Sequence, residues 1–133
     1  MNLMTDEYRQ QLVVKHSVRP WGGGGASWVN PMSNWIDMSG IKTVLDYGCG
    51  RRTFKPAMLR VYPDLDIREY DPGIPGLDAM PEPADLLVCT DVMEHFEPDY
   101  VDAGIAHLHS LAQKQVFLVI SCMLLSLIHI SEP

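Results

Sequence analysis

The chain has 133 residues, of which 47% are hydrophobic and 20% charged, and its formal net charge is −7. These values exclude a disordered chain and fit one globular domain, on the small side for a complete α/β enzyme. The excess of acids disfavours a nucleic-acid partner, because a surface that neutralises phosphates needs Lys and Arg.

The cysteines and the apolar stretches restrict the compartment. Cys49, Cys89 and Cys122 lie far apart and form no C-x-x-C pair, so we expect reduced thiols and a cytoplasmic protein. The polar start of the chain does not resemble a signal peptide. The longest apolar stretch, residues 116–130, is shorter than the roughly twenty residues that span a bilayer, so no membrane partner is expected.

Two helices are predicted in the first forty residues. Thr5 can cap a helix that ends before Pro20, with Tyr8, Leu12 and His16 on one face. The glycines at 22–25 then form either a hinge, which lets this helix close over a ligand, or a flexible surface loop. Asn30 and Pro31 predict the start of a second helix, and Gly40 predicts its end.

The next segment reads as a buried strand, a glycine turn and a helix. Residues 43–45 are β-branched or apolar, Asp46 follows, and Gly48 and Gly50 flank Cys49. Glycines at these positions allow a left-handed backbone and close approach of a ligand. A helix is predicted over residues 56–61. A dinucleotide fingerprint would need a third glycine where Thr53 stands, which disfavours an NAD-dependent oxidoreductase, the enzymatic alternative.

The D-x-G-x-G arrangement of Asp46, Gly48 and Gly50 resembles motif I of the class I S-adenosylmethionine (SAM)-dependent methyltransferases. The resemblance implies that the acid and the turn, Cys49 included, surround the methionine end of the cofactor. A tight turn without any ligand is the purely structural alternative.

A second carboxylate follows the next strand. Residues 66–70 are predicted to form this strand, and Asp71 stands at its carboxyl end, about twenty residues beyond Gly50, where an acid accepts ribose hydroxyls. A solvated turn before Pro72 is the alternative. After it, any third strand within residues 73–83 must be short. There the resemblance implies that Asp78 and Ala79 contact adenine, with Met80 another position that fits.

The apolar run of residues 84–90 predicts a fourth strand, central in a parallel sheet. Residues 85–95 resemble the family's segment D-L-V-V-x-x-x-V-L-E-H. The resemblance implies that the backbone of Thr90 and Asp91 holds the cofactor's amino group. A helix is predicted from Pro98, with one apolar face that includes Val101, Ile105, Leu108 and Ala112 and with His107 and His109 towards solvent. Residues 115–121 predict the fifth strand.

Glu94 and His95 have three interpretations. They can satisfy local backbone groups at a helix start, or act as catalytic groups that position the acceptor or remove its proton. Alternatively, Asp91, Glu94 and His95 match the acid-x-x-Glu-His metal site of some methyltransferases. A further ligand from later in the chain is missing from that pattern, so no metal is expected.

The last twelve residues differ from the rest. Residues 126–133 resemble translated sequencing-adapter sequence, and we expect the tail over 122–133 not to be native. The natural protein is then expected to continue beyond about residue 121. In that case the last strands of the fold are missing and the fifth strand has an exposed edge.

The sequence therefore predicts an α/β fold: a Rossmann-like three-layer sandwich with a mostly parallel sheet, incomplete at five strands. Residues 1–40 are expected to supply helices that cap the site, and residues 41–121 the SAM-binding core. The expected function is SAM-dependent methyl transfer to an unidentified acceptor. The non-enzymatic alternative is a fragment that binds SAM without catalysis or is inert.

Overall fold

The computed structural model describes residues 2–18 and 24–121. Residues 22 and 23 of the expected hinge, Cys122 and the tail over 122–133 lie outside the described residues.

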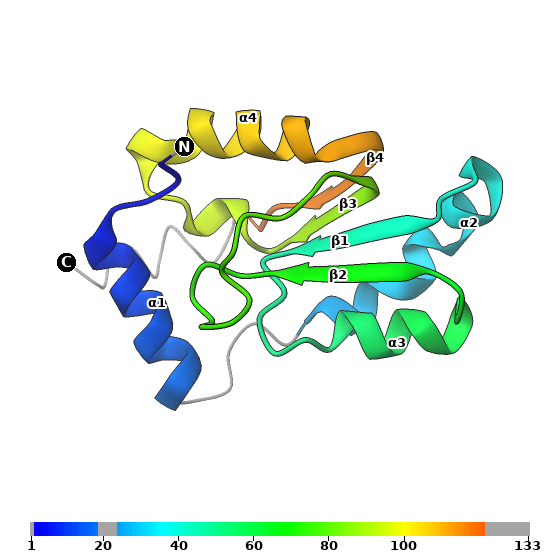
Figure 1. Ribbon diagram of the computed structural model, residues 1–133, viewed down its shortest axis with the longest axis horizontal. Helices are drawn as coiled ribbons and strands as arrows, with labels where there is room; N and C mark the ends of the chain where they lie inside the picture. The colour runs from blue at the N-terminus through cyan, green and yellow to red at the C-terminus, as the bar shows by residue number, and fades with distance from the viewer. Residues whose placement is uncertain (1, 19–23, 122–133) are drawn as a thin grey trace.

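Four parallel strands form the centre of the fold (Figure 1). They are β1 (Thr43–Tyr47), β2 (Asp66–Tyr70), β3 (Ala84–Thr90) and β4 (Ala112–Val119), in the order β2-β1-β3-β4. The first strand, β1, is an inner strand. β2 lies on one side of it, and β3 and β4 lie on the other side, as in doubly wound folds. The predicted Rossmann-like α/β architecture is therefore confirmed.

The expected short strand within residues 73–83 does not form, so the described residues hold four strands and not five. This segment folds back on itself in successive turns. The amides of Ile74 and Leu77 donate to the carbonyls of Asp71 and Ile74, and the Asp71 amide donates to the Leu77 carbonyl. Because these groups bond to one another, they are not available to a strand ladder.

Helices cover both faces of the sheet (Figure 1). One face carries α4 (Val101–Leu111), and the other carries α2 (Val29–Ser39) and α3 (Phe54–Val61). The helix α1 (Asp6–Val18) lies beyond the carboxyl ends of the strands. Three short 3-10 helices complete the described elements: η1 (Gly25–Trp28), η2 (Met93–His95) and η3 (Pro98–Tyr100). Among the described residues, no helix combines the length and apolar character that a membrane crossing requires.

The helix ends follow local chemistry, with small shifts from the prediction. The Thr5 hydroxyl accepts a hydrogen bond from the Tyr8 amide at 3.1 Å, which confirms the predicted cap of α1. Gly40 ends α2 in the left-handed conformation, as predicted. Both α2 and α3 begin two residues before the predicted starts, because the short η1 helix leads directly into α2 and Thr53 precedes α3.

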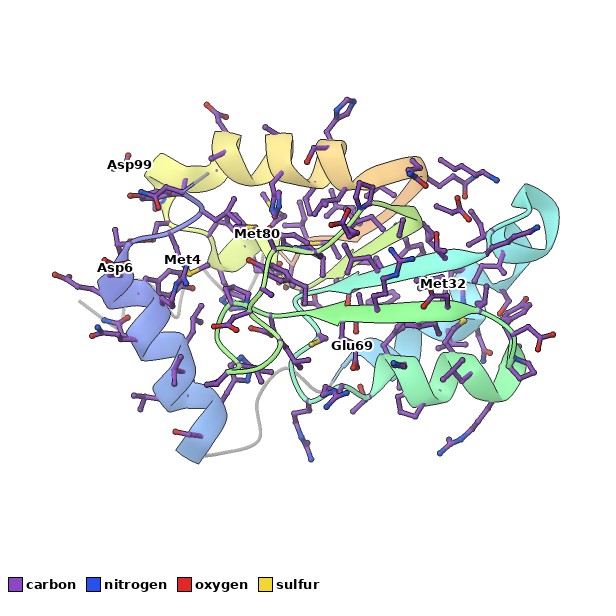
Figure 2. All side chains as sticks on the ribbon, viewed as in Figure 1. Met4, Asp6, Met32, Glu69, Met80 and Asp99 are labelled. Atoms are coloured by element: carbon purple, nitrogen blue, oxygen red, sulfur yellow. The ribbon has the colours of Figure 1, made fainter. Side chains whose placement is uncertain are left out.

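Two apolar layers hold the sheet between the helices. On one face, α2 and α3 pack on the strands through a cluster that includes Met32, Ile36 and Met58. Met32 is labelled in Figure 2. On the other face, Leu108 and Leu111 of α4 pack on Leu45 and Leu87. Because α2 shares its core with β1, β2 and β3, it belongs to the same packed unit as the sheet.

The buried face of α4 differs from the predicted one. Ile105, placed in the apolar face from its spacing, is 54% exposed, whereas His107, expected in solvent, is only 6% exposed. His107 turns inward because the Tyr47 hydroxyl lies 2.8 Å from its Nδ1 atom and satisfies it. The prediction for these two residues was therefore wrong, while His109 is exposed as predicted.

Candidate functional site

A pocket of about 340 Å³ lies at the carboxyl ends of the strands, the edge at which open α/β sheets bind ligands. Its walls come from five parts of the chain: α1 and the residue Met4 before it, the start of η1, the glycine turn with the end of β1, the turn after β2, and the end of β3 with the segment that follows it. The described lining residues are Met4, Tyr8, Leu12, His16, Gly24, Gly25, Asp46, Tyr47, Gly48, Cys49, Gly50, Asp71, Pro72, Thr90, Asp91, Val92, His95 and Phe96.

The glycine turn requires its glycines. Gly48 has a φ of 82° and Gly50 a φ of 54°, both in the left-handed region that L side chains avoid. A Cβ atom on Gly48 would also lie 2.3 Å from the Cγ2 atom of Val92. The Val92 side chain therefore packs directly on Gly48, where a larger residue does not fit.

The amides of this turn are used inside the protein. Gly48 and Cys49 both donate to the Tyr70 carbonyl, at 2.7 and 3.1 Å, and Gly50 donates to Oδ2 of Asp71 at 2.9 Å. Phosphate groups bind in glycine-rich turns through unoccupied amides. These three amides are therefore not available to a phosphate.

Asp71 links the two turns. Its Oδ2 atom accepts the Gly50 amide and its Oδ1 atom accepts the Gly73 amide, each at 2.9 Å. The Nε2 atom of His16 lies 3.6 Å from Oδ1. A carboxylate has about four acceptor positions, so each oxygen keeps capacity for another donor. The structure brings Asp71 into the same pocket as Asp46, and the expected ribose contact remains a prediction.

Asp46 is a buried carboxyl group beside two other acids. It is 4% exposed and lines the pocket, and no hydrogen bond to its carboxylate comes from the described residues. Burial, together with the nearby charges of Glu69 and Asp71, raises the pKa of Asp46 to about 7. An ionised Asp46 therefore lacks a counter-ion unless a ligand supplies one.

Glu69 is the neighbour of Asp46 across the parallel pair of β1 and β2. It points from β2 towards the side of the sheet on which α3 lies (Figure 2). Arg52 neutralises it, with Nη2 and Nε of the guanidinium 2.7 and 2.8 Å from Oε1 of Glu69. Because this arginine is committed to Glu69, it does not compensate Asp46.

After β3 the chain lines the opposite wall. Thr90, Asp91 and His95 all line the pocket. Asp91 has a φ of 57°, which is uncommon for a residue with a side chain, and its amide donates to the Val119 carbonyl at 2.9 Å. The backbone thus turns sharply at the position predicted to hold the cofactor's amino group.

The two residues of the predicted catalytic pair, Glu94 and His95, have different surroundings. His95 lines the pocket, whereas Glu94 does not. Oε2 of Glu94 accepts the Ser121 amide at 3.2 Å, just beyond β4, and burial raises the pKa of this carboxyl group. The geometry gives Glu94 a structural contact at the end of the sheet, and of the two residues only His95 lines the pocket.

Two further predictions gain no geometric support. Asp78 and Ala79 are exposed and do not line the pocket, so their expected contact with adenine remains a prediction. Within the part of the chain that the structure describes, no group of three or more His, Cys, Asp or Glu side chains is arranged to hold a metal ion. The alternative metal site at Asp91, Glu94 and His95 thus has no support.

Cys49 lines the pocket, and burial raises the pKa of its thiol, which keeps the thiol neutral.

The helix α1 is attached to the rest of the protein on both sides of the pocket. At its start, the Thr5 amide and hydroxyl donate to the Glu97 carboxylate at 2.8 and 2.9 Å, and the Tyr8 hydroxyl donates to the His95 carbonyl. Further along, Leu12 and His16 pack on the turn after β2, where a Cβ atom on Gly73 would lie 2.8 Å from Leu12. The helix face predicted to hold Tyr8, Leu12 and His16 is therefore the face that lines the pocket.

Several site residues were missed from the sequence. Glu69 had a usable signal, because it stands two residues before Asp71 in a strand and opposite Asp46 in a parallel pair. Glu97, Val92 and Tyr47 had none, since their roles depend on contacts with residues far away in the chain.

No protein-family model matches the chain, and no curated protein matches it. Among solved structures, the chain is similar to TnmH, with a TM-score of 0.53 and 13% identity, covering 84% of this chain and 38% of that one. An O-methyltransferase family protein from Burkholderia thailandensis matches with a TM-score of 0.46 and 16% identity, covering 67% and 37%. The likeness to TnmH shows a shared fold, and the chain spans less than two fifths of either structure.

Proposed function

We propose that the chain is the SAM-binding part of a class I methyltransferase, which transfers a methyl group to an acceptor that is not yet identified. The observation that carries this proposal is the charge of the pocket. Its described lining contains Asp46, Asp71 and Asp91 and no Lys or Arg. A cavity of this kind favours a ligand with a positive group and disfavours one with several phosphates.

The same geometry argues against a dinucleotide. A pyrophosphate would need the amides of the glycine turn and the N-terminus of the following helix. The turn amides bond to Tyr70 and Asp71. The start of α3 is covered, since the Ala26 amide donates to the Thr53 hydroxyl at 3.3 Å and a Cβ on Gly25 would lie 3.0 Å from Phe54.

In the proposed complex, each wall holds one part of SAM. Asp46 and the glycine turn would face the methionine end, Asp71 would accept the ribose hydroxyls, and the backbone of Thr90 and Asp91 would hold the amino group. The bound cofactor supplies an electrophilic methyl group. The protein contributes orientation and exclusion of water, so no nucleophilic Ser or Cys is needed.

His95 is the proposed group on the acceptor side. Its position in the lining allows it to orient an acceptor or to accept its proton, because an imidazole titrates near neutral pH. Glu94 is not assigned a catalytic role in this proposal, since it bonds to Ser121 away from the pocket.

Calorimetric titration with SAM, S-adenosylhomocysteine (SAH) and NAD tests the proposal. We expect SAM and SAH to bind at one site and NAD not to bind. Asp71→Asn should weaken both by about tenfold or more, because a hydrogen bond to a charged group contributes roughly 1.5–3 kcal/mol. Asp64→Asn, an exposed acid beyond α3, is the matched control.

Each other outcome has a definite meaning. Preferential binding of NAD would replace the proposal with the oxidoreductase alternative. If none of the three binds, the proposal is rejected. Binding of SAM without methyl transfer to any acceptor would favour the non-catalytic alternative.

A further inference from the structure

The charges at the floor of the pocket lead to a specific expectation about ligand choice. We propose that the pocket selects its ligand by charge: it prefers the sulfonium SAM over the neutral thioether SAH, and Asp46 is the group that discriminates. This inference rests on the proposed function and goes beyond it, since binding of the cofactor alone does not require any preference.

Asp46 is a buried acid whose charge the described residues do not compensate. It is buried, it lines the cavity, and the described residues donate no hydrogen bond to its carboxylate. A buried carboxylate without a partner costs free energy, and a cation at the open side of the group removes that cost. A neutral ligand in the same place would instead leave the charge without a partner.

The charged and titratable groups around Asp46 add to the attraction for a cation. From β2 and its turn come Glu69, which Arg52 neutralises, and Asp71, which lies near His16 of α1. From the glycine turn and β3 come the thiols of Cys49 and Cys89, which burial keeps neutral by raising their pKa. The segment after β3 adds Asp91 and His95 to the lining. Because Arg52 compensates Glu69, the three aspartates Asp46, Asp71 and Asp91 give the lining an excess of acidic groups.

The sulfonium is the part of SAM that this arrangement fits. In SAM one methylene group joins the sulfur to the ribose, so a ribose held at Asp71 would keep the sulfonium in the same pocket as Asp46. Asp46 lies on β1 and pairs with Glu69 of the neighbouring strand β2. Asp71 follows two residues after Glu69, just beyond the end of β2. The amino group is common to SAM and SAH and is assigned to the backbone after β3, so it does not discriminate between the two ligands.

The preference should depend on pH, because only the ionised form of Asp46 attracts a cation. Burial and the neighbouring acids raise its pKa to about 7, so the carboxyl group is protonated in mild acid and ionised above neutrality. The affinity for SAM should therefore rise with pH, while that for SAH should change less.

Titration of the full chain with SAM and with SAH at about pH 5.5 and about pH 8 tests the inference. We expect a preference for SAM of about tenfold or more at the higher pH, falling below about threefold at the lower pH. In Asp46→Asn the preference should stay below about threefold at both values, because the group that titrates near pH 7 is gone. Asp64→Asn, far from the pocket, should behave as the unmodified chain.

A second readout does not depend on any variant. Near pH 7, binding of SAM should release part of a proton from Asp46, which calorimetry in buffers of different ionisation enthalpy detects, whereas binding of SAH should release less. Equal affinity for the two ligands at both pH values, or a preference that survives in Asp46→Asn, overturns the inference and leaves the proposed function intact. Failure to bind either ligand overturns both.

Discussion

Asp46 places an acid where the protein alone does not stabilise its charge. Its neighbours are Glu69 and Asp71, and its carboxylate faces a cavity. A residue of this kind lowers the stability of the fold in return for affinity towards a ligand, which is a common property of functional sites. The cost should be measurable in the unliganded protein.

We expect Asp46→Asn to be more stable than the unmodified chain above neutral pH. The pKa in the folded state is about 7, raised from 3.8, so the folded protein holds its proton while the unfolded chain has lost it. Stability of the unmodified chain therefore falls as pH rises from about 4 to about 7. At about pH 8 the variant should gain roughly 1–4 kcal/mol, since one pKa unit corresponds to about 1.4 kcal/mol.

Urea unfolding at about pH 6 and about pH 8 measures this difference, which should be larger at the higher value. A variant that is less stable than the unmodified chain at both values would show that Asp46 stabilises the fold, contrary to this account.

Gly48 is constrained both by its backbone angle and by its neighbour. Gly48→Ala should lower the free energy of unfolding by about 2–4 kcal/mol, because it adds left-handed strain to a clash with Val92. Gly76→Ala is the control: its φ is 92°, but no atom lies within 4 Å of the added Cβ, so a loss of about 1–2 kcal/mol is expected. Equal losses in the two variants would contradict the close approach to Val92.

The pair of Tyr47 and His107 is the main buried polar contact that the sequence did not reveal. Burial lowers the pKa of His107, so a neutral imidazole meets the hydroxyl. Tyr47→Phe should cost about 1–2 kcal/mol, because it leaves the Nδ1 atom without its partner. In a double-mutant cycle with His107→Leu, the second change should cost less in the Tyr47→Phe background. Strictly additive losses would show that the two side chains do not interact.

At the scale of elements, α1 forms one wall of the pocket and covers the carboxyl edge of the sheet (Figure 1). The helix has no core of its own and is attached by Glu97, by the His95 carbonyl and by packing on the Gly73 turn. These contacts connect it to the segments after β3 and β2, which are also the walls of the pocket. The position of α1 and the binding of a ligand should therefore be coupled.

Glu97→Ala should loosen α1, since the Thr5 amide and hydroxyl lose their acceptor. We expect faster hydrogen exchange in residues 6–18 and an affinity for SAM that is lower by about three- to tenfold, while the sheet remains protected. Glu82→Ala, a change at an exposed acid, is the matched control. Unchanged exchange in α1 would show that the Glu97 contact does not hold the helix.

At the scale of the whole molecule, local signals predicted the sheet well. The bounds of β2 and β3 agree with the predicted residues, because each is an apolar or alternating run that ends at a turn residue. The glycine turn was also predictable, since glycines with positive φ leave a sequence pattern. Asp46 and Asp71 stand at or just beyond the carboxyl ends of β1 and β2, so their common edge follows from parallel topology.

The remaining features depend on contacts between distant residues. His107 is buried against Tyr47, which lies sixty positions earlier in the chain, whereas Ile105 of the same helix is exposed. The strand β4 begins at Ala112 and not at residue 115, because α4 leads into it without a loop. Periodicity within one segment contains no information about such partners.

One face of β4 is apolar and exposed. Among the described strands β4 lies at an edge of the sheet, and Val116, Leu118 and, just beyond it, Ile120 are exposed. Phe117 on the opposite face packs near Trp28, with ring centroids 6.1 Å apart. An apolar edge strand of this kind is an aggregation hazard in solution. Binding experiments should therefore use dilute protein and confirm that the sample is monodisperse.

The most direct test of the central claim is an experimental structure of the chain with SAM. The account predicts density for the ligand in the pocket under α1, with the ribose hydroxyls on the Asp71 carboxylate and the sulfonium on the side of Asp46. A ligand bound elsewhere, or a saturated sample in which this pocket stays empty, would contradict it.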